Sequence, residues 1–180
     1  LTLLYHISYQ ISNIFSATVE ELCEVEGITE NSAVLISMLP QLMKKVKVND
    51  FSNAVVNSAD VLCKYCKAIF EGEVYEKIKV ICLDNKLKVI GCDEIGSGTT
   101  GRLVFDLRKI VETAIKYKSD MIVIAHNHPK NNSLPSNADI SATNMIKSTL
   151  QSLDMKLLDH IIVGEKDVTS LRDSGYMFDL

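Results

Sequence analysis

The chain opens with apolar residues that recur at helical spacing. Over residues 19–42 they fall mostly three or four positions apart, which is the period of an amphipathic helix. Gly27 interrupts the series, so the pattern predicts two short helices. The polar stretch 44–58 reads as a connection. We therefore expect a small helical unit over residues 1–50 and a linker over residues 51–57.

Beyond the linker, apolar runs typical of strands are interleaved with segments of helical period. The pattern predicts helices over Ala59–Phe70, Asp106–Tyr117 and from Ser136 to about Leu153, and strands over Val74–Leu83, Leu87–Ile90, Met121–Ala125 and Leu157–Val163. Asp84 and Asn85 favour a hairpin between the first two strands, and glycines at 96–101 favour a turn. The alternation predicts an α/β layered domain over residues 58–180.

Composition and charge narrow the function classes. With 47% apolar residues in 180, the chain can bury a core, which argues against disorder. Its net charge of -4 supplies no broad positive field for nucleic acid. The longest apolar run considered, Met121–Ala125, is far shorter than the ~20 residues of a membrane-spanning helix, so we expect no membrane partner.

The start of the chain and its cysteines point to the cytoplasm. No basic residue precedes Lys44, so the opening segment lacks the charge pattern of a secretory signal. Five scattered cysteines fit reduced thiols better than disulfides. Because the chain does not begin with Met, we expect N-terminal sequence to be missing.

Two histidines and an aspartate form the strongest chemical pattern. His126 and His128 follow the predicted strand Met121–Ala125, and Asp139 lies at the start of the next helix. Residues two apart in extended backbone project to the same side, so both imidazoles can face one ion. Three such ligands leave one position of a tetrahedral Zn²⁺ open, as in catalytic sites. We predict one metal per chain, most simply zinc, although iron also accepts this ligand set.

The same helix start has a second interpretation. Ser136 and Asp139 have the Ser-x-x-acid spacing of a capping box. Capping and metal binding are about equally supported for Asp139 by local pattern alone. We expect that an Asp139 carboxylate turned to the metal cannot also close the box, and that Ser136 keeps a hydrogen bond to the helix amides or to the water on the metal.

These residues, with Glu94, resemble the JAMM (MPN-plus) metalloprotease signature: Glu, then His-x-His, seven residues, Ser, two residues and Asp. The Ser97-Gly98-Thr99 turn, the His-Asn-His-Pro loop and the stretch 157–164 are similar to the bacterial RadC family over about residues 58–180. The resemblance implies a mixed sheet flanked by helices, with layering related to that of cytidine deaminases. It also implies a zinc-dependent hydrolase of peptide or isopeptide bonds.

By this resemblance, His126, His128 and Asp139 bind Zn²⁺, and Glu94 is the general base toward the water on the metal. Ser136 would help to hold the developing oxyanion. We further expect the strand that ends at Glu94 to pair beside the strand Met121–Ala125. The alternatives are a DNA repair or recombination factor, as the family's name suggests, and a scaffold with an inactive metal site. The sequence does not identify the substrate.

The N-terminal unit resembles the helix-hairpin-helix region that precedes RadC domains. Thr29 stands where the hairpin usually has its second glycine, and Glu26 and Glu30 flank the turn. Acidic groups repel DNA phosphates, so DNA binding is doubtful and a packing role is favoured.

Four further residues invite chemistry for which we favour a structural interpretation. Cys63 and Cys66 lie in a helical pattern without a second pair, so redox or zinc chemistry is not favoured there. We expect His160 to be a structural strand residue and Arg108 to lie on a solvated helix face.

Overall fold

The computed structural model describes residues 11–51, 55–56, 58–98 and 105–177. The chain divides into two compact units at residues 47 and 48, which are described separately. Among the described residues, none of the helices combines the length and apolar character needed to cross a membrane.

The first unit is helical, as expected, but its last helix is long. Its helices are α2 (Ile11–Ser16), α3 (Val19–Cys23) and α4 (Glu30–Asp50). Thr18 and Glu21 form a capping box that starts α3, and Gly27, with φ +91°, lies in the turn before α4. The expected short second helix and polar connection from residue 44 are therefore wrong. Residues 44–49 contain neither Gly nor Pro, and polarity alone does not end a helix.

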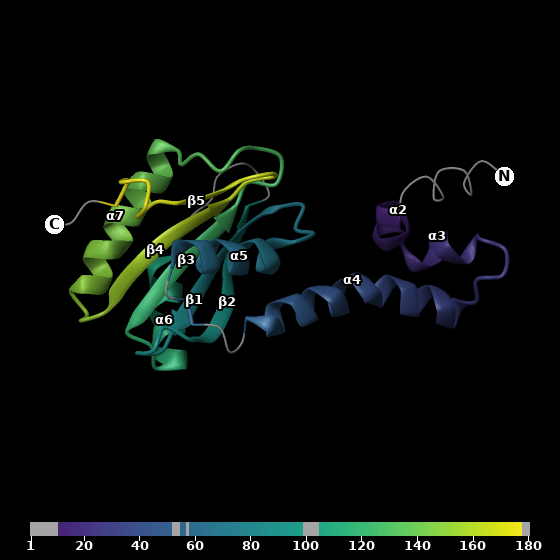
Figure 1. Cartoon of the computed structure of the whole chain (residues 1–180), viewed down its shortest axis with the longest axis horizontal. Coiled ribbons are helices and arrows are strands. Elements are labelled where there is room, and N and C mark those ends of the chain that lie inside the picture. The colour runs from purple at the N-terminus through teal and green to yellow at the C-terminus, as the bar shows by residue number, and fades with distance from the viewer. Residues whose placement is uncertain (1–10, 52–54, 57, 99–104, 178–180) are drawn as a thin grey trace. The chain divides into compact units, whose positions relative to one another are not determined.

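The second unit is built on a five-stranded mixed sheet of order β2-β1-β3-β4-β5 (Figure 1). Its strands are β1 (Glu76–Leu83), β2 (Val89–Gly98), β3 (Met121–Asn127), β4 (Lys156–Val163) and β5 (Val168–Ser170). Neighbours are antiparallel except β3 and β4, which are parallel. The expected hairpin is confirmed, and Asp84 Oδ1 accepts hydrogen bonds from the amides of Lys86 and Lys88 in its turn.

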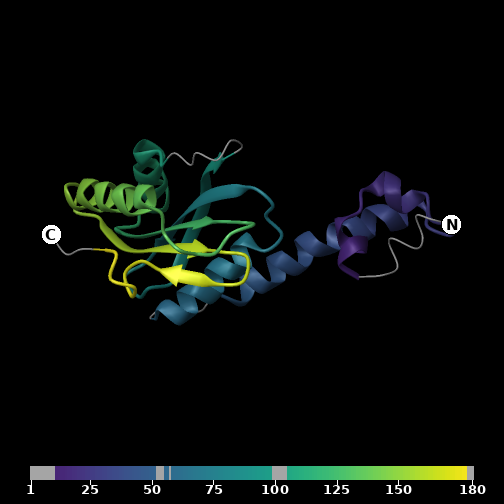
Figure 2. The ribbon, with the colours of Figure 1, turned by 90° about the horizontal axis from the view of Figure 1, so that it is seen from above.

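Helices cover both faces of this sheet (Figure 2). They are α5 (Ala59–Phe70), α6 (Leu107–Tyr117) and α7 (Asn137–Gln151). Side chains of α5 pack on one face with Ile81, Val123 and Ile161. Those of α6 and α7 pack on the other with Ile78, Ile124 and Leu157. The predicted layered fold is thus confirmed.

Several element ends differ from the prediction. β3 continues to Asn127, so His126 is a strand residue, and β2 continues through the start of the expected turn to Gly98. The rest of that turn lies outside the described residues. The short strand β5 was not expected, because its three residues are too few to give a periodic signal. The strand carrying Glu94 was expected beside β3, which is wrong, because β1 lies between them.

Candidate metal centre

The carboxyl end of β3 and the first turn of α7 meet on the face covered by α6 and α7. In β3, apolar residues point alternately to the two faces, and His126 follows Ile122 and Ile124 on the α7 side. Asp139 lies in the first turn of α7. The fold thereby brings a strand end and a helix start together at one place.

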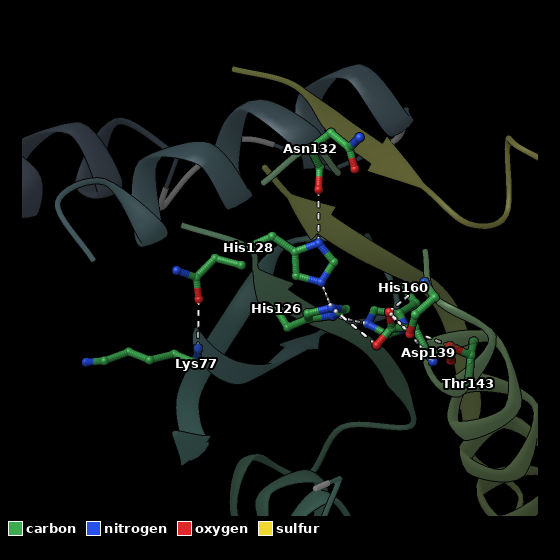
Figure 3. Close-up of polar contacts among 9 residues, drawn as sticks. Lys77, His126, His128, Asn132, Asp139, Thr143 and His160 are labelled. Carbon is green, nitrogen blue, oxygen red and sulfur yellow. Dashed lines mark hydrogen bonds and ion pairs between the residues drawn. The ribbon is translucent and has the colours of Figure 1, made fainter. Parts of the chain in front are cut away.

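His126, His128 and Asp139 converge there (Figure 3). Each offers one ligand atom, and these atoms lie within 4.8 Å of one another. His126 Nε2 is 3.0 Å from His128 Nε2 and 3.4 Å from Asp139 Oδ1. Two nitrogens on a tetrahedral zinc ion at the usual bond lengths are about 3.3 Å apart. The spacing around His126 therefore fits a metal ion.

The proton on His128 has a defined position. Its Nδ1 lies 3.0 Å from the carbonyl oxygen of Asn132, and a carbonyl can only accept. Nδ1 therefore carries the hydrogen, and the Nε2 of the neutral ring presents its electron pair to the site. The Asn132 carbonyl acts as the outer partner that orients a ligating imidazole.

Burial keeps His126 neutral. The residue is 1% exposed, and desolvation lowers its pKa from 6.5 to about 4, against the opposing effect of Asp139. A neutral imidazole is the form that binds a metal. On its other side, His126 Nδ1 lies 2.8 Å from Nε2 of His160, which is fully buried. Desolvation, followed by the neighbouring histidines, also lowers the pKa of His160.

Asp139 uses its two carboxylate oxygens differently. Oδ2 accepts hydrogen bonds from the Ser136 amide (2.8 Å) and hydroxyl (2.6 Å), and the Asp139 amide donates to Ser136 Oγ (3.1 Å). Oδ1 is the oxygen that faces His126. The expectation that ligand geometry and capping box exclude each other is therefore wrong, because one oxygen serves each. Ser136 bonds to a helix amide as expected, while its own hydrogen points to Asp139.

Glu94 is not brought to the histidines. It pairs in register with Lys79, whose Nζ donates to Ile69 O and lies over the Phe70 ring, on the α5 side. The Glu94 carboxylate lies 3.0 Å from Lys77 Nζ. Figure 3 shows the Lys77 side chain pointing away from the histidines. The residue expected as the general base thus lies on the opposite face, with β1 between its strand and β3.

Glu76 is the acidic residue that sequence reasoning missed. It lies two positions before Ile78 on β1, and Ile78 pairs with His126. Alternation puts Glu76 on the same face as Ile78 and His126, and continuing the antiparallel register by two residues brings it opposite His128. Within the described residues its carboxylate has no hydrogen bond or ion pair. A signal was available: Glu76, Ile78 and Val80 share one face of a predicted strand.

The two cysteines and Arg108 lie as the structural interpretation predicts. Cys66 is completely buried, and burial raises the pKa of Cys63 to about 11 and that of Cys66 well above its usual value, so neither thiol is poised to react. Arg108 pairs with Glu112 on the exposed side of α6.

Asp159, beside His160, accepts hydrogen bonds from Ser170 Oγ and from the amides of His160 and Arg172. These hydrogen bonds tie the chain after β5 to β4.

The five-stranded mixed sheet between helices and the His-His-Asp group at the end of its central strand define a JAB/MPN-type α+β domain with a candidate metal centre. The chain belongs to the RadC-like JAB domain family, which matches residues 56–176. The RadC resemblance is thereby confirmed.

Curated relatives extend the likeness over nearly the whole chain. A UPF0758 protein of Thermotoga maritima is 31% identical over 96% of this chain and 78% of its own length. Those of Janthinobacterium sp. (30% identical) and Pelodictyon phaeoclathratiforme (30% identical) cover 91% and 94% of this chain and 74% and 76% of their own lengths, respectively. Their names state no activity.

Proposed function

We propose that the second unit is a zinc-dependent hydrolase of peptide or isopeptide bonds. The observation that carries the proposal is the convergence of His126 Nε2, His128 Nε2 and Asp139 Oδ1. With His128 Nδ1 protonated, and with the hydrogen of His126 on its Nδ1, these atoms would present electron pairs to one point and no hydrogen among them. A cation resolves that repulsion, and two imidazoles with one carboxylate are a zinc ligand set that leaves a position open.

The three side chains would hold the metal, one ion per chain, and Asn132 and Ser136 would orient two of them. A bound zinc ion supplies Lewis acidity toward water and toward the carbonyl oxygen of a scissile amide. Ser136, at the exposed start of α7, donates its hydroxyl hydrogen to Asp139 Oδ2 and is proposed to donate to the developing oxyanion when it releases that oxygen.

We assign the general base to Glu76 in place of Glu94. A base must come within hydrogen-bond reach of the proton that it takes, directly or through one water. Glu76 lies on the face of His126 and opposite His128, whereas Glu94 is paired with Lys77 on the α5 side. Glu76 would take a proton from the attacking water and deliver it to the leaving amine.

A groove opens on the α5 face of the sheet, which is the face opposite to the histidines. Its volume is about 490 Å³, and its lining includes Phe70, Asn127 and Val163 but none of the three proposed metal ligands, so it is not part of this site. Asn127 is held rigidly, because Oδ1 accepts from the Lys77 amide and Nδ2 donates to the Tyr75 carbonyl.

Two measurements test this function. Elemental analysis should find about one zinc per chain in the purified protein and little in His126→Ala. Turnover of a library of peptides and ubiquitin-like isopeptides should be abolished in Glu76→Gln, which keeps its metal, and largely retained in Glu94→Gln as the matched control. Loss of turnover only in Glu94→Gln would return the base to that residue. Metal binding without turnover of any amide substrate would favour the scaffold alternative.

A further inference from the structure

A buried chain of hydrogen bonds runs from the candidate metal centre into α7 and back to Asp139. His126 Nδ1 lies 2.8 Å from His160 Nε2, and His160 Nδ1 lies 2.6 Å from Thr143 Oγ. Thr143 Oγ in turn lies 2.6 Å from the Asp139 carbonyl oxygen, one helical turn earlier. The side chains of His126, His160, Thr143 and Asp139 are labelled in Figure 3. The chain joins one proposed ligand to the backbone of another.

The short contacts fix where the hydrogens lie. An oxygen–oxygen contact of 2.6 Å needs a hydrogen between its atoms, and the Asp139 carbonyl has none, so the Thr143 hydroxyl hydrogen lies there. The 2.6 Å contact to His160 needs a hydrogen as well, and only His160 Nδ1 can supply it. The Nε2 of a neutral His160 is then an acceptor, and His126 Nδ1 carries the hydrogen between the two rings.

The reverse order of donors leaves one contact unsatisfied. If the Thr143 hydroxyl donated to His160, the 2.6 Å contact with the Asp139 carbonyl would bring two unprotonated oxygens together. That order would also put a hydrogen on His126 Nε2, the atom that faces His128 and Asp139. A protonated Nε2 cannot bind a metal.

We propose that His160 and Thr143 are positioning residues, which hold His126 in the tautomer whose Nε2 is free to bind the metal. The inference rests on the proposed metal site, and neither residue touches the metal. Both are fully buried, and the Phe105 ring packs edge-on against His126 (5.8 Å) and His160 (5.5 Å). Water therefore has no access to replace a missing partner.

The test removes the Thr143 hydroxyl without changing the shape of the side chain. Thr143→Val deletes the acceptor of the His160 hydrogen, and Thr143→Ser restores it. Thr113→Val is the matched control, because Thr113 is 7% exposed on α6 and its hydroxyl donates to the Lys109 carbonyl in the same way (2.8 Å), away from the histidines. All variants are made in the full chain, and their folding is checked by thermal denaturation with a chelator present.

Two readouts separate positioning from simple packing. The first is the zinc affinity, measured by competition with a chromophoric chelator. We expect a 10–100-fold loss in Thr143→Val, the usual size for an outer partner of a metal ligand, and little change in Thr143→Ser and Thr113→Val. The second is the tautomer of His126, read from the ¹⁵N shifts of its ring in the metal-free protein at pH 8. We expect hydrogen on Nδ1 in the wild type and partly on Nε2 in Thr143→Val.

Each outcome decides the proposal. Hydrogen on Nε2 of His126 in the wild type would overturn it, as would unchanged affinity and tautomer in Thr143→Val. Equal losses of affinity in Thr143→Val and Thr113→Val would reduce the effect to packing and overturn it too. If the wild type takes up no zinc, the proposed function fails at its metal site, and the tautomer readout alone then judges the positioning role.

Discussion

Single side chains at this centre divide their polar atoms between support and chemistry. His126 turns Nδ1 to His160 and Nε2 to the site, and His128 turns Nδ1 to Asn132 and Nε2 to the site. Asp139 caps its helix with Oδ2 and faces His126 with Oδ1. Each of these side chains is therefore held in place by neighbouring groups of the protein before a ligand binds. This lowers the entropy lost when the side chain becomes ordered on binding.

Substitutions of Asp139 can separate its capping of α7 from its proposed binding of the metal. In Asp139→Asn the amide oxygen can still accept from the Ser136 amide, so stability in chelator should change by less than about 0.5 kcal/mol, while zinc affinity falls at least tenfold. Asp139→Ala should lose affinity and also about 1 kcal/mol of stability. Urea denaturation with chelator and zinc titration check both; a fall in stability without a fall in affinity would leave Asp139 as a cap only.

Buried neutral histidines make the metal-free protein sensitive to acid. The pKa of His126 is lowered to about 4 and that of His160 is lowered too, by desolvation, whereas both titrate near 6.5 when unfolded. Below pH 6.5 the unfolded chain therefore binds more protons, and the free energy of unfolding should fall as the pH drops toward 4. For His126 alone the loss approaches about 3 kcal/mol. Denaturant titrations in chelator from pH 7.5 to 4.5 measure this dependence. A free energy of unfolding that does not change over this pH range would contradict the prediction.

At the scale of elements, β1 determines which side chains can reach the centre. It lies between β2 and β3, so it separates Glu94 from the histidines and presents Glu76 on their face. Helix α7 contributes Asp139 and Thr143, one turn apart and therefore on one side. The site is thus assembled from β1, β3, β4 and α7, together with the loop after β3, which carries His128.

The packing of α6 on β2 depends on a glycine. A Cβ at Gly91 would lie 2.3 Å from Tyr117 Cδ1, and Tyr117 also donates from its hydroxyl to Asp93 (2.7 Å). Gly91→Ala must displace the whole ring, so we expect a loss of about 1–3 kcal/mol in the free energy of unfolding. Adding Tyr117→Ala should make the glycine replacement nearly neutral in a double-mutant cycle. An additive result in denaturant titrations would show that the ring does not set the constraint.

At the scale of the whole molecule, charge separates this chain from general nucleic-acid binders. The net charge is -4, and residues 1–57 contain three basic and six acidic side chains. Glu26 and Glu30 flank the Gly27 turn of the first unit. For the first unit we therefore still predict a packing role or a contact with a protein, and we do not favour DNA as its partner.

We expect the full chain to bind duplex DNA no more tightly than about micromolar at physiological salt, because its 19 Lys and Arg residues are outnumbered by 23 Asp and Glu and give no broad positive field. Fluorescence anisotropy over a salt series measures this. Submicromolar binding with a steep salt slope would contradict it, and Glu26→Lys with Glu30→Lys should then tighten binding further.

The sequence by itself determined much of this protein. Apolar periodicity was sufficient for the hairpin, the central strand, all three helices of the second unit and the layered fold, because burial imposes local periods of 2 and 3.6. The His-x-His spacing and Asp139 predicted the residues that converge, because a strand end, the loop residue after it and the next helix start are neighbours in the chain as well as in space.

Only the tertiary structure decided what depends on strand order and register. The sequence does not show that β1 lies between β2 and β3, so it pointed to Glu94 and passed over Glu76, which differ in face and in strand. It also gave no sign that His160 stands behind His126, because the two lie 34 positions apart in the chain and only the parallel pairing of β3 and β4 brings them together. Contacts between residues far apart in the chain depend on which strands are neighbours, and the apolar period of a single strand does not determine the strand order.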